Sequence, residues 1–426
     1  MESGILLRSF LLEGPLVPNH RPTILQIIPR LDTGGAERTT IEMTQAITAA
    51  GGRALVVTEG GRMVPQVTEA GGEVMTFNAG TKNPLSMLIN ARRLQKLVER
   101  EQVDLLHARS RAPAWTALWA ARLSGRPFVT TYHGAYNEKG ALKRTYNSVM
   151  ARGDVVIANS HYTSRLIQSR YGTPESRIRV IHRGIDEESF DPSNVSPERV
   201  ERLQRHWGIR PGQRVVLHAA RLTGWKGQSV VIAAAARLAQ QNFAGDDWVV
   251  ILAGDAQGRT DYVRDLEQQI AASGLSQRVR LVGHVEDMPA AYVTAHVAVV
   301  ASTEPEAFGR AAAEAEAMCC PVIATDIGAT PETVRAEPVV SREEITGWLV
   351  PPGDPEALAQ RLREALSLSE EERAAIGKRA RDHVCRSFSL GAMQAATLQV
   401  YDSLLGTRLA EAWSAVSSSR TCVPSA

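Results

Sequence analysis

The stretches TILQIIPRL (residues 23–31) and RALVVT (residues 53–58) decide the fold class, because each is a short, largely apolar run of the kind found in buried strands. A segment with helical periodicity, residues 36–50, lies between them. Strand, helix and strand in this order make a βαβ unit, in which the two strands lie parallel in one sheet. The start of the chain therefore predicts an α/β fold with a doubly wound sheet.

The same alternation runs through the rest of the chain and restarts near its middle. In the first half it predicts helices and strands at residues 85–101, 104–107, 112–124, 128–132, 155–158 and 178–182. After a polar segment at 196–211, it predicts strands at 214–219, 248–253, 279–282, 297–301 and 321–325 and helices at 229–241, 261–273 and 309–318. The 426 residues also exceed the size at which one core usually stops growing, so two Rossmann-like domains are predicted.

We place the first domain at residues 23–205, after an N-terminal extension of residues 1–22, and the second domain at residues 206–388. A helix at 389–408 is expected to pack back on the first domain. The Ser- and Ala-rich tail, residues 409–426, is expected to be frayed. Open parallel sheets bind ligands beyond the carboxyl ends of their strands, so the active site should lie in the cleft between the domains.

The composition is that of an ordinary globular protein, with 44% apolar and 22% charged residues. The cysteines form neither a Cys-x-x-Cys pair nor a zinc-like cluster, which favours a reducing cytoplasm; they are Cys319, Cys320, Cys385 and Cys422. The extension is interrupted by Arg8, Glu13 and Pro15, unlike a signal peptide, and no long apolar run predicts a membrane span. We expect a cytoplasmic enzyme, membrane-linked only at the inner face of the cytoplasmic membrane.

Positive charge is concentrated in the first half, where residues 1–200 hold 25 Lys and Arg against 19 Asp and Glu. The predicted helix at 85–101 and the loop after residue 138 carry many of these cations: Arg92, Arg93, Lys96, Arg100, Lys139, Lys143 and Arg144. Such a group is suited to an anionic lipid surface or an anionic acceptor. A soluble helix with a basic outer face explains the same pattern, and nothing in it indicates nucleic-acid binding.

Two cations lie between a predicted strand and a predicted helix in the second half. The loop Arg221-Leu-Thr-Gly-Trp-Lys226 follows the strand at 214–219 and opens the helix at 229–241. Backbone N–H groups at a helix start already favour an anion, and Arg221 and Lys226 add full charges suited to a diphosphate. Two solvated surface cations are the alternative interpretation.

A pair of glutamates follows the strand at 297–301, in the segment Glu304-Pro-Glu306-Ala-Phe308-Gly309-Arg-Ala-Ala-Ala-Glu314. A carboxylate before a helix is commonly a cap, and one inside a helix commonly faces solvent. Here the alanines around Glu314 make a slim helix, which allows a ligand to approach closely. Ligand binding is therefore a competing interpretation of both glutamates.

The first half offers two further loops at strand ends. Gly34-Gly35-Ala36-Glu37 follows the first strand, and His133-Gly134 follows the strand at 128–132. Two glycines at a helix start allow close approach of a phosphate or sugar, although the third glycine of a dinucleotide fingerprint is absent. A single histidine is more often structural than catalytic.

The motifs together resemble the family-four retaining glycosyltransferases with the GT-B fold. The resemblance covers about residues 23–405 and rests on Glu306-x7-Glu314 with Phe308-Gly309 between, Arg221, Lys226, Gly254-Asp255, Thr325-Asp326-Ile-Gly328 and Gly347-Trp-Leu-Val-Pro-Pro-Gly353-Asp354. It implies two Rossmann-like domains facing a central cleft, with the nucleotide-sugar donor held mainly by the second domain.

The resemblance also implies roles for individual residues. Arg221 and Lys226 bind the donor diphosphate, Glu314 binds the ribose, and Glu306 faces the transferred sugar. Further donor contacts fall to the backbone of Phe308 and Gly309, to Gly254, and to His284 and Val285 beside the base. His133 lies beside the donor sugar and the acceptor, and Gly34, Gly35 and Glu37 form the acceptor-side loop. The residues expected to be catalytic are His133, Glu306, Arg221 and Lys226.

A same-face retaining reaction without metal or cofactor is what the resemblance implies, with a hexose-type sugar passing to a glycan or lipid-linked acceptor. The chain has no Asp-x-Asp pair to hold a metal, so Arg221 and Lys226 should neutralise the diphosphate. The segment Arg183-Gly184-Ile-Asp186 stands where similar enzymes commonly have Asn-Gly. This variant favours a role in lipopolysaccharide or other surface-polysaccharide assembly. Two departures from similar enzymes leave the donor sugar open: Arg310, where an aliphatic residue is usual, and Ala329, where glycine is common.

Three alternatives remain open on the sequence. A nucleotide-sugar epimerase or phosphorylase also pairs two Rossmann-like halves. An NAD-dependent oxidoreductase is a second alternative, disfavoured by the incomplete glycine fingerprint. A catalytically silent binding subunit is the third, disfavoured by the presence of Glu306, Glu314, Arg221 and Lys226.

Overall fold

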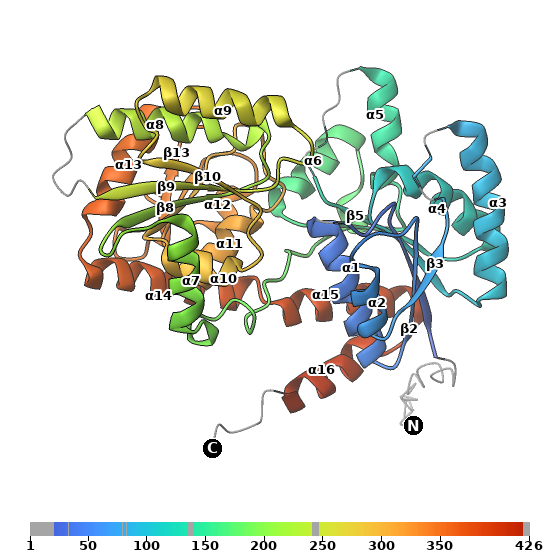
Figure 1. The fold of residues 1–426 in the computed structure, drawn as a ribbon. Helices are drawn as coiled ribbons and strands as arrows, with labels where there is room; N and C mark the ends of the chain where they lie inside the picture. Colours follow the sequence, from blue (N-terminus) through green and yellow to red (C-terminus); the bar gives the residue numbers. More distant parts are fainter. Residues whose placement is uncertain are drawn as a thin grey trace, which may run out of the picture.

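The computed structural model describes residues 21–32, 34–78, 80–81, 83–134, 136, 140–240 and 247–420. Most of the predicted extension, residues 1–20, lies outside the described residues, as do Lys139, Cys422 and the end of the tail. The described chain forms two α/β domains side by side, each with a parallel sheet covered by helices on both faces (Figure 1). This confirms the predicted GT-B architecture.

The first sheet has seven parallel strands in the order β3-β2-β1-β4-β5-β6-β7. Its strands are β1 (Thr23–Ile27), β2 (Arg53–Thr58), β3 (Glu73–Thr76), β4 (Leu105–Ala108), β5 (Phe128–Tyr132), β6 (Val155–Ala158) and β7 (Ile178–Val180). The covering helices are α1 (Gly35–Ala49), α2 (Val64–Glu69), α3 (Pro84–Arg100), α4 (Arg111–Ser124), α5 (Ala141–Asn147) and α6 (His161–Tyr171), with the short 3-10 helices η1 (Ser148–Ala151) and η2 (Glu175–Arg177). The order reverses between β1 and β4, which defines the switch point of this sheet.

The second sheet has six parallel strands in the order β10-β9-β8-β11-β12-β13. Its strands are β8 (Arg214–Ala219), β9 (Trp248–Ala253), β10 (Val279–Gly283), β11 (Val297–Val300), β12 (Val322–Thr325) and β13 (Gly347–Val350). Its helices are α7 (Pro197–Trp207), α8 (Gln228–Gln240), α9 (Thr260–Ala272), α10 (Met288–Thr294), α11 (Arg310–Ala317), α12 (Thr330–Thr333), α13 (Pro355–Ser367) and α14 (Glu370–Ser387), with η3 (Pro192–Asn194) and η4 (Gly224–Lys226). The switch point lies between β8 and β11.

Apolar residues of the strands and of the inward helix faces fill a core on each side of both sheets. In the first sheet, Leu25 and Leu106 contribute to one core and Ile24 and Leu105 to the other. Successive strand residues point to opposite faces, and both faces are covered, so these strands are continuously apolar.

Among the described helices, none combines the length and the hydropathy needed to cross a bilayer.

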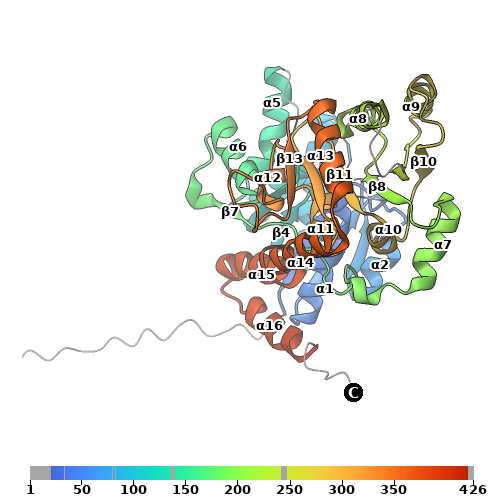
Figure 2. The ribbon, with the colours of Figure 1, turned by 90° about the vertical axis from the view of Figure 1, so that its left-hand side faces the viewer.

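The chain returns from the second domain to the first near its C-terminus. Helix α15 (Leu390–Leu405) follows α14 and lies beside α1 in Figures 1 and 2. Leu398 and Tyr401 are buried in the same core as Ile24. The Gln394 side chain donates a hydrogen bond to the carbonyl oxygen of Glu42 on α1, at 2.8 Å. Helix α15 is therefore part of the first domain's core.

The tail expected to be frayed begins instead with helix α16 (Leu409–Arg420). The Asp402 carboxylate accepts hydrogen bonds from the backbone N–H groups of Leu409 and Ala410, which starts the helix. Leu409, Ala410 and Trp413 are buried against the first domain. The expectation was wrong for this segment, because three apolar residues on one face suffice to hold a short Ser- and Ala-rich helix when a partner surface is present.

The predicted domain boundary between residues 205 and 206 was also wrong, since it falls inside α7. Leu203 and Trp207 of this helix pack in the second domain's core with Val215 and Tyr292. The chain therefore changes domain earlier, between β7 and α7.

Candidate active site

The predicted site residues lie around two adjoining cavities in the cleft between the domains. The larger cavity has a volume of about 580 Å³ and the smaller about 300 Å³. The larger is lined by the predicted residues Gly34, Gly35, Glu37, His133, Arg221, Lys226, Glu306, Phe308, Gly309 and Glu314. The smaller is lined by Gly254, His284 and Val285, together with Gly34, Arg221 and Glu314. The fold thus brings every sequence-predicted site residue to one cleft.

Lys226 and Glu306 meet across the switch point of the second sheet. Lys226 lies in the loop after β8 and Glu306 in the loop after β11, and the ammonium group donates a hydrogen bond to Glu306 Oε1. Ser302 Oγ donates to the same oxygen at 2.5 Å, and the Lys226 ammonium lies 4.3 Å from the centre of the Trp225 ring. The two side chains are 16% and 13% exposed, so this charge pair is largely shielded from water at the cavity wall.

The backbone of Glu306 is fixed by the loop after β12. Ala329 N–H donates to the Glu306 carbonyl at 2.9 Å. Gly328 has φ of +70°, and a Cβ there would lie 2.4 Å from the same carbonyl oxygen. Because only glycine fits this close approach, Gly328 is needed to hold the Glu306 loop in place.

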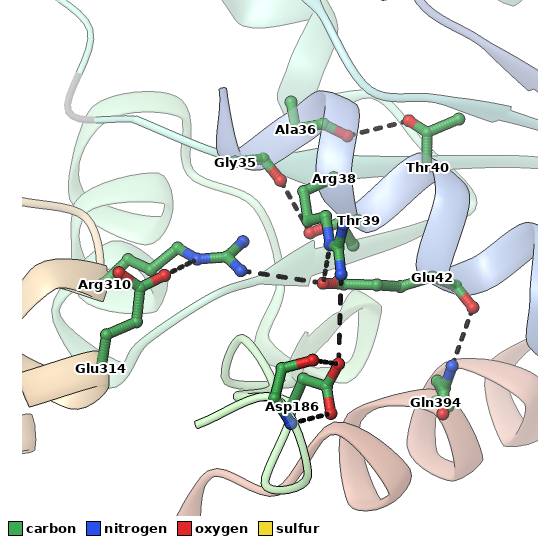
Figure 3. A network of polar contacts seen from close by, with 11 residues as sticks. Gly35, Ala36, Arg38, Thr39, Thr40, Glu42, Asp186, Arg310, Glu314 and Gln394 are labelled. Atoms are coloured by element: carbon green, nitrogen blue, oxygen red, sulfur yellow. Dashed lines mark hydrogen bonds and ion pairs between the residues drawn. The ribbon is translucent and has the colours of Figure 1, made fainter. Parts of the chain in front are cut away.

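Glu314 lies one turn inside α11 and faces both cavities. Arg310 Nε, at the start of the same helix, donates to Glu314 Oε1 at 2.6 Å. Figure 3 shows the guanidinium of Arg310 reaching onward to Glu42 of α1, in the first domain, with 3.8 Å between the nearest nitrogen and oxygen. A carboxylate of the second domain and one of the first therefore share a single guanidinium.

His133 follows β5 and is held by an arginine. The Arg183 guanidinium donates to His133 Nδ1 at 3.0 Å, so the remaining ring proton is on Nε2. Burial, together with the charges of Arg183 and Arg109, lowers the pKa of His133 well below its usual value. The imidazole is therefore neutral. Its Nε2 has no hydrogen-bond partner among the described residues.

The glycine loop of the first domain accommodates Arg183. A Cβ at Gly35 would lie 1.7 Å from the Arg183 guanidinium, so the missing side chain makes room for this arginine. Burial, followed by the charge of Arg310, lowers the pKa of Arg183 to about 10. Glu37 lines the same cavity, and burial raises the pKa of its carboxyl despite the nearby charges of Arg183 and Arg221.

Two family models match the chain. A model described as Glycosyltransferase Family 4 matches residues 33–189, and one described as Glycosyl transferases group 1 matches residues 200–383. The crystal structure of a glycosyltransferase from Rickettsia africae is 32% identical, covers 91% of this chain and all of that one, and superposes with a TM-score of 0.81. This chain belongs to the family-four glycosyltransferases. The predicted transferase class is thereby confirmed.

Two other relatives of this glycosyltransferase are described together with a ligand or a substrate. An Anabaena protein solved in complex with UDP-glucose is 26% identical, with a TM-score of 0.76 over 90% of this chain and all of that one. A D-inositol 3-phosphate glycosyltransferase from Salinispora tropica is 29% identical over 75% of this chain and 67% of its own length.

The sequence assigned no role in the site to several residues that line the larger cavity of this glycosyltransferase, among them Asn159, Arg183 and Trp225. Asn159 directly follows β6, and Arg183 lies in the segment after β7. The rule that ligands bind beyond the carboxyl ends of strands applies to both of them.

Within the described residues, no three or more His, Cys, Asp or Glu side chains are grouped so that they could hold a metal ion.

Proposed function

We propose that this glycosyltransferase moves a hexose-type sugar from a nucleotide-diphosphate sugar to a glycan or lipid-linked acceptor, with retention and without a metal ion. The observation that carries the proposal is the meeting of Lys226 and Glu306 at the switch point, with Arg221 on the same cavity wall. The complex of the Anabaena relative with UDP-glucose supports UDP-hexose as the first donor to test.

Metal independence rests on the two cations. Negative charge on the diphosphate grows as the bond between C1 and the donor phosphate oxygen breaks. Lys226 ends η4, Arg221 lies three residues before η4, and both line the larger cavity, so both can oppose this charge. Turnover should therefore survive excess EDTA. Activity lost with EDTA and restored by Mg²⁺ or Mn²⁺ contradicts this part of the proposal.

Retention is proposed to follow a same-face pathway. The acceptor oxygen bonds to C1 on the face from which the diphosphate leaves, and the acceptor proton passes to a phosphate oxygen of the leaving group. No protein nucleophile is then required. The neutral His133, with its proton on Nε2, is suited to orient a hydroxyl by hydrogen bonding. Nuclear magnetic resonance of the product should find the donor's anomeric configuration kept; an inverted product contradicts the pathway.

The acceptor is proposed to be a surface glycan or its lipid-linked precursor, as in lipopolysaccharide or other surface-polysaccharide assembly. The segment Arg183-Gly184-Ile-Asp186 supports this assignment. A phosphorylated cyclitol is the second candidate, favoured by the relatives named D-inositol 3-phosphate glycosyltransferase. Release of UDP from UDP-glucose, measured with each acceptor in turn, distinguishes them, because a transferase releases UDP quickly only with its own acceptor.

Attachment to the inner face of the cytoplasmic membrane is proposed to use the outer face of α3. On this helix Leu85, Leu88 and Ile89 are 68%, 50% and 48% exposed, and they continue one helical stripe with the exposed cations Arg92, Arg93, Lys96 and Arg100. Apolar side chains beside cations suit the boundary of an anionic bilayer.

The membrane proposal is tested by flotation with vesicles at low salt. The protein should float with acidic vesicles, and Arg92→Glu, Arg93→Glu and Lys96→Glu together should release it, since each cation contributes about 1 kcal/mol. A matched control reverses Arg202 and Arg205 on α7, which are 72% and 71% exposed. Equal recovery with neutral vesicles, or equal loss in the control, contradicts the proposal.

A further inference from the structure

Arg310 contacts two carboxylates that belong to different domains. Its Nε donates to Glu314 Oε1 at 2.6 Å, and its terminal nitrogen lies 3.8 Å from Glu42 Oε1 (Figure 3). A guanidinium carries five donors in a rigid fork, so it can serve two carboxylates at once, which a lysine ammonium does less well. Together, Glu314 and Glu42 raise the pKa of Arg310, although burial is the largest single effect and acts in the opposite direction.

Glu42 depends on this contact. Its side chain is only 4% exposed, and its Oε2 has no hydrogen-bond partner among the described residues. Burial raises the pKa of the Glu42 carboxyl, and Arg310, Arg38 and Arg183 oppose that rise, in this order. Arg38 lies on the same helix and donates at 3.3 Å. Arg310 is therefore one of three cations that stabilise the Glu42 charge, and it is the one that comes from the second domain's α11.

The two contacts of Arg310 differ in kind. The distance to Glu314 is that of a short charge-assisted hydrogen bond, whereas 3.8 Å to Glu42 is beyond hydrogen-bond range. Under the proposed function, ribose hydroxyls donate to Glu314 when the nucleotide binds. They then share the Glu314 charge that Arg310 pairs with in the free protein, which lets the guanidinium move closer to Glu42.

We propose that Arg310 is a positioning residue that orients Glu314 for the nucleotide ribose and, through Glu42, couples nucleotide binding to contact between the two domains. This inference rests on the proposed function of Glu314. It assigns a purpose to the arginine that stands where similar enzymes usually have an aliphatic residue, and to a buried glutamate of α1 that has no place in the proposed reaction.

The test measures the dissociation constant of UDP by calorimetry in four proteins: the parent, Arg310→Leu, Glu42→Gln and the double variant. Coupling energies between sites commonly correspond to a factor of about five or more, so each single variant should weaken UDP binding about fivefold. In the Arg310→Leu background, Glu42→Gln should have no further effect on UDP binding, because in this proposal Glu42 is coupled to the nucleotide through Arg310. An equal effect of Glu42→Gln in both backgrounds, including no effect in either, overturns the coupling.

A conservative variant gives a second readout that separates the two-sided contact from charge alone. Arg310→Lys keeps a charge beside Glu314 but not the two-sided contact, so its UDP affinity should stay as low as that of Glu42→Gln. Recovery of the parent's UDP affinity by lysine overturns the two-sided role.

A matched control uses another contact between the domains. The Glu332 carboxylate, on α12, accepts hydrogen bonds from the backbone N–H of His161 at 2.8 Å and of Tyr162 at 2.6 Å, at the start of α6. Glu332→Gln should leave UDP affinity unchanged, since Glu332 does not touch Glu314. A fivefold loss in this control shows a general loosening of the domains and overturns the specific role of Arg310.

A further variant separates failure of the inference from failure of the proposed function. If Glu314→Ala leaves UDP affinity unchanged, the nucleotide site itself is wrong. If Glu314→Ala weakens UDP binding while Arg310→Leu and Glu42→Gln act independently, only the coupling is wrong.

Discussion

At the switch point of the second sheet, Lys226 and Glu306 meet on a cavity wall, whereas at that of the first sheet the charged group is buried. Arg109 directly follows β4, is 2% exposed, and donates from Nε to Gln26 of β1 at 2.7 Å. Nearby on β4, His107 contacts the Tyr401 hydroxyl of α15 at 2.7 Å. In the second sheet both strand ends at the switch point thus open to a ligand, whereas in the first sheet the loop after β1 lines the cleft and the end of β4 contacts the returning chain.

The difference follows from what covers each strand end. In the second domain the loops after β8 and β11 line the larger cavity, and Lys226 of one loop contacts Glu306 of the other there. In the first domain α15 packs onto the core, and burial lowers the pKa of both His107 and Arg109. The buried polar groups of the first switch point thus link β1, β4 and α15 by hydrogen bonds, whereas Lys226 and Glu306 at the second face a ligand cavity.

The largest expected effect comes from removing the charge of Lys226 at the switch point of the second sheet. Lys226→Ala should lower kcat/KM by a factor that corresponds to about 2 kcal/mol or more, because Lys226 opposes charge that grows in the transition state. Steady-state kinetics with UDP-glucose measure it, with thermal unfolding as the control for folding. An unchanged kcat/KM excludes Lys226 from the diphosphate site.

The next largest effect distinguishes the role of Glu314 from that of Glu306. Removing hydrogen bonds to a charged group costs about 1.5–3 kcal/mol, so Glu314→Ala should weaken binding of UDP about tenfold or more. Glu306→Ala should leave UDP affinity nearly intact and depress transfer, because its partner is present only in the sugar-bearing donor. Calorimetry with UDP alone decides between the roles: equal losses in the two variants show that the assignment is wrong.

A smaller effect is expected at the covered switch point. Tyr401→Phe removes the hydroxyl that contacts His107, which should lower the free energy of unfolding by about 1 kcal/mol. Affinity for UDP should not change, because neither residue lines the cleft cavities. Denaturant unfolding and calorimetry measure the two quantities. Weaker UDP binding with an unchanged free energy of unfolding would show that the first sheet's switch point serves binding and not stability.

The smallest expected effect is a change in unfolding free energy at mildly acidic pH, caused by replacing Glu316. This residue lies two positions after Glu314 on α11 and is fully buried. Its Oε1 accepts from Thr346 at 2.6 Å, and burial raises its pKa well above the usual value. Above pH 4.5 the unfolded carboxyl loses its proton while the folded one keeps it, so this group lowers stability as pH rises. Glu316→Gln should match the parent below pH 4.5 and become progressively more stable than it at higher pH.

The measurement for Glu316 is the difference in unfolding free energy between variant and parent across a pH series, in which the other groups cancel. A difference that does not grow with pH contradicts a neutral Glu316 in the folded protein.

The sequence by itself determined the elements and the position of the site. Five strands, Arg53–Thr58, Phe128–Tyr132, Val155–Ala158, Arg214–Ala219 and Trp248–Ala253, have the predicted bounds, because a strand covered on both faces is a largely apolar run. The edge strand β3 was missed, since its residues are exposed or half-buried and lack that pattern. The residues around the cleft were found because parallel strands bring all their carboxyl ends to one edge of each sheet.

Only the tertiary structure decided which distant groups meet. The Ser- and Ala-rich tail and the polar segment at 196–211 do not reveal which surface covers α16 or α7, so the predictions of a frayed tail and of the domain boundary were wrong. The contacts of Arg183 with His133 and of Arg310 with Glu42 join segments far apart in the chain. Charged side chains carry no periodic signal of their partner, because their energies depend on burial and distance, which are fixed only when the domains pack.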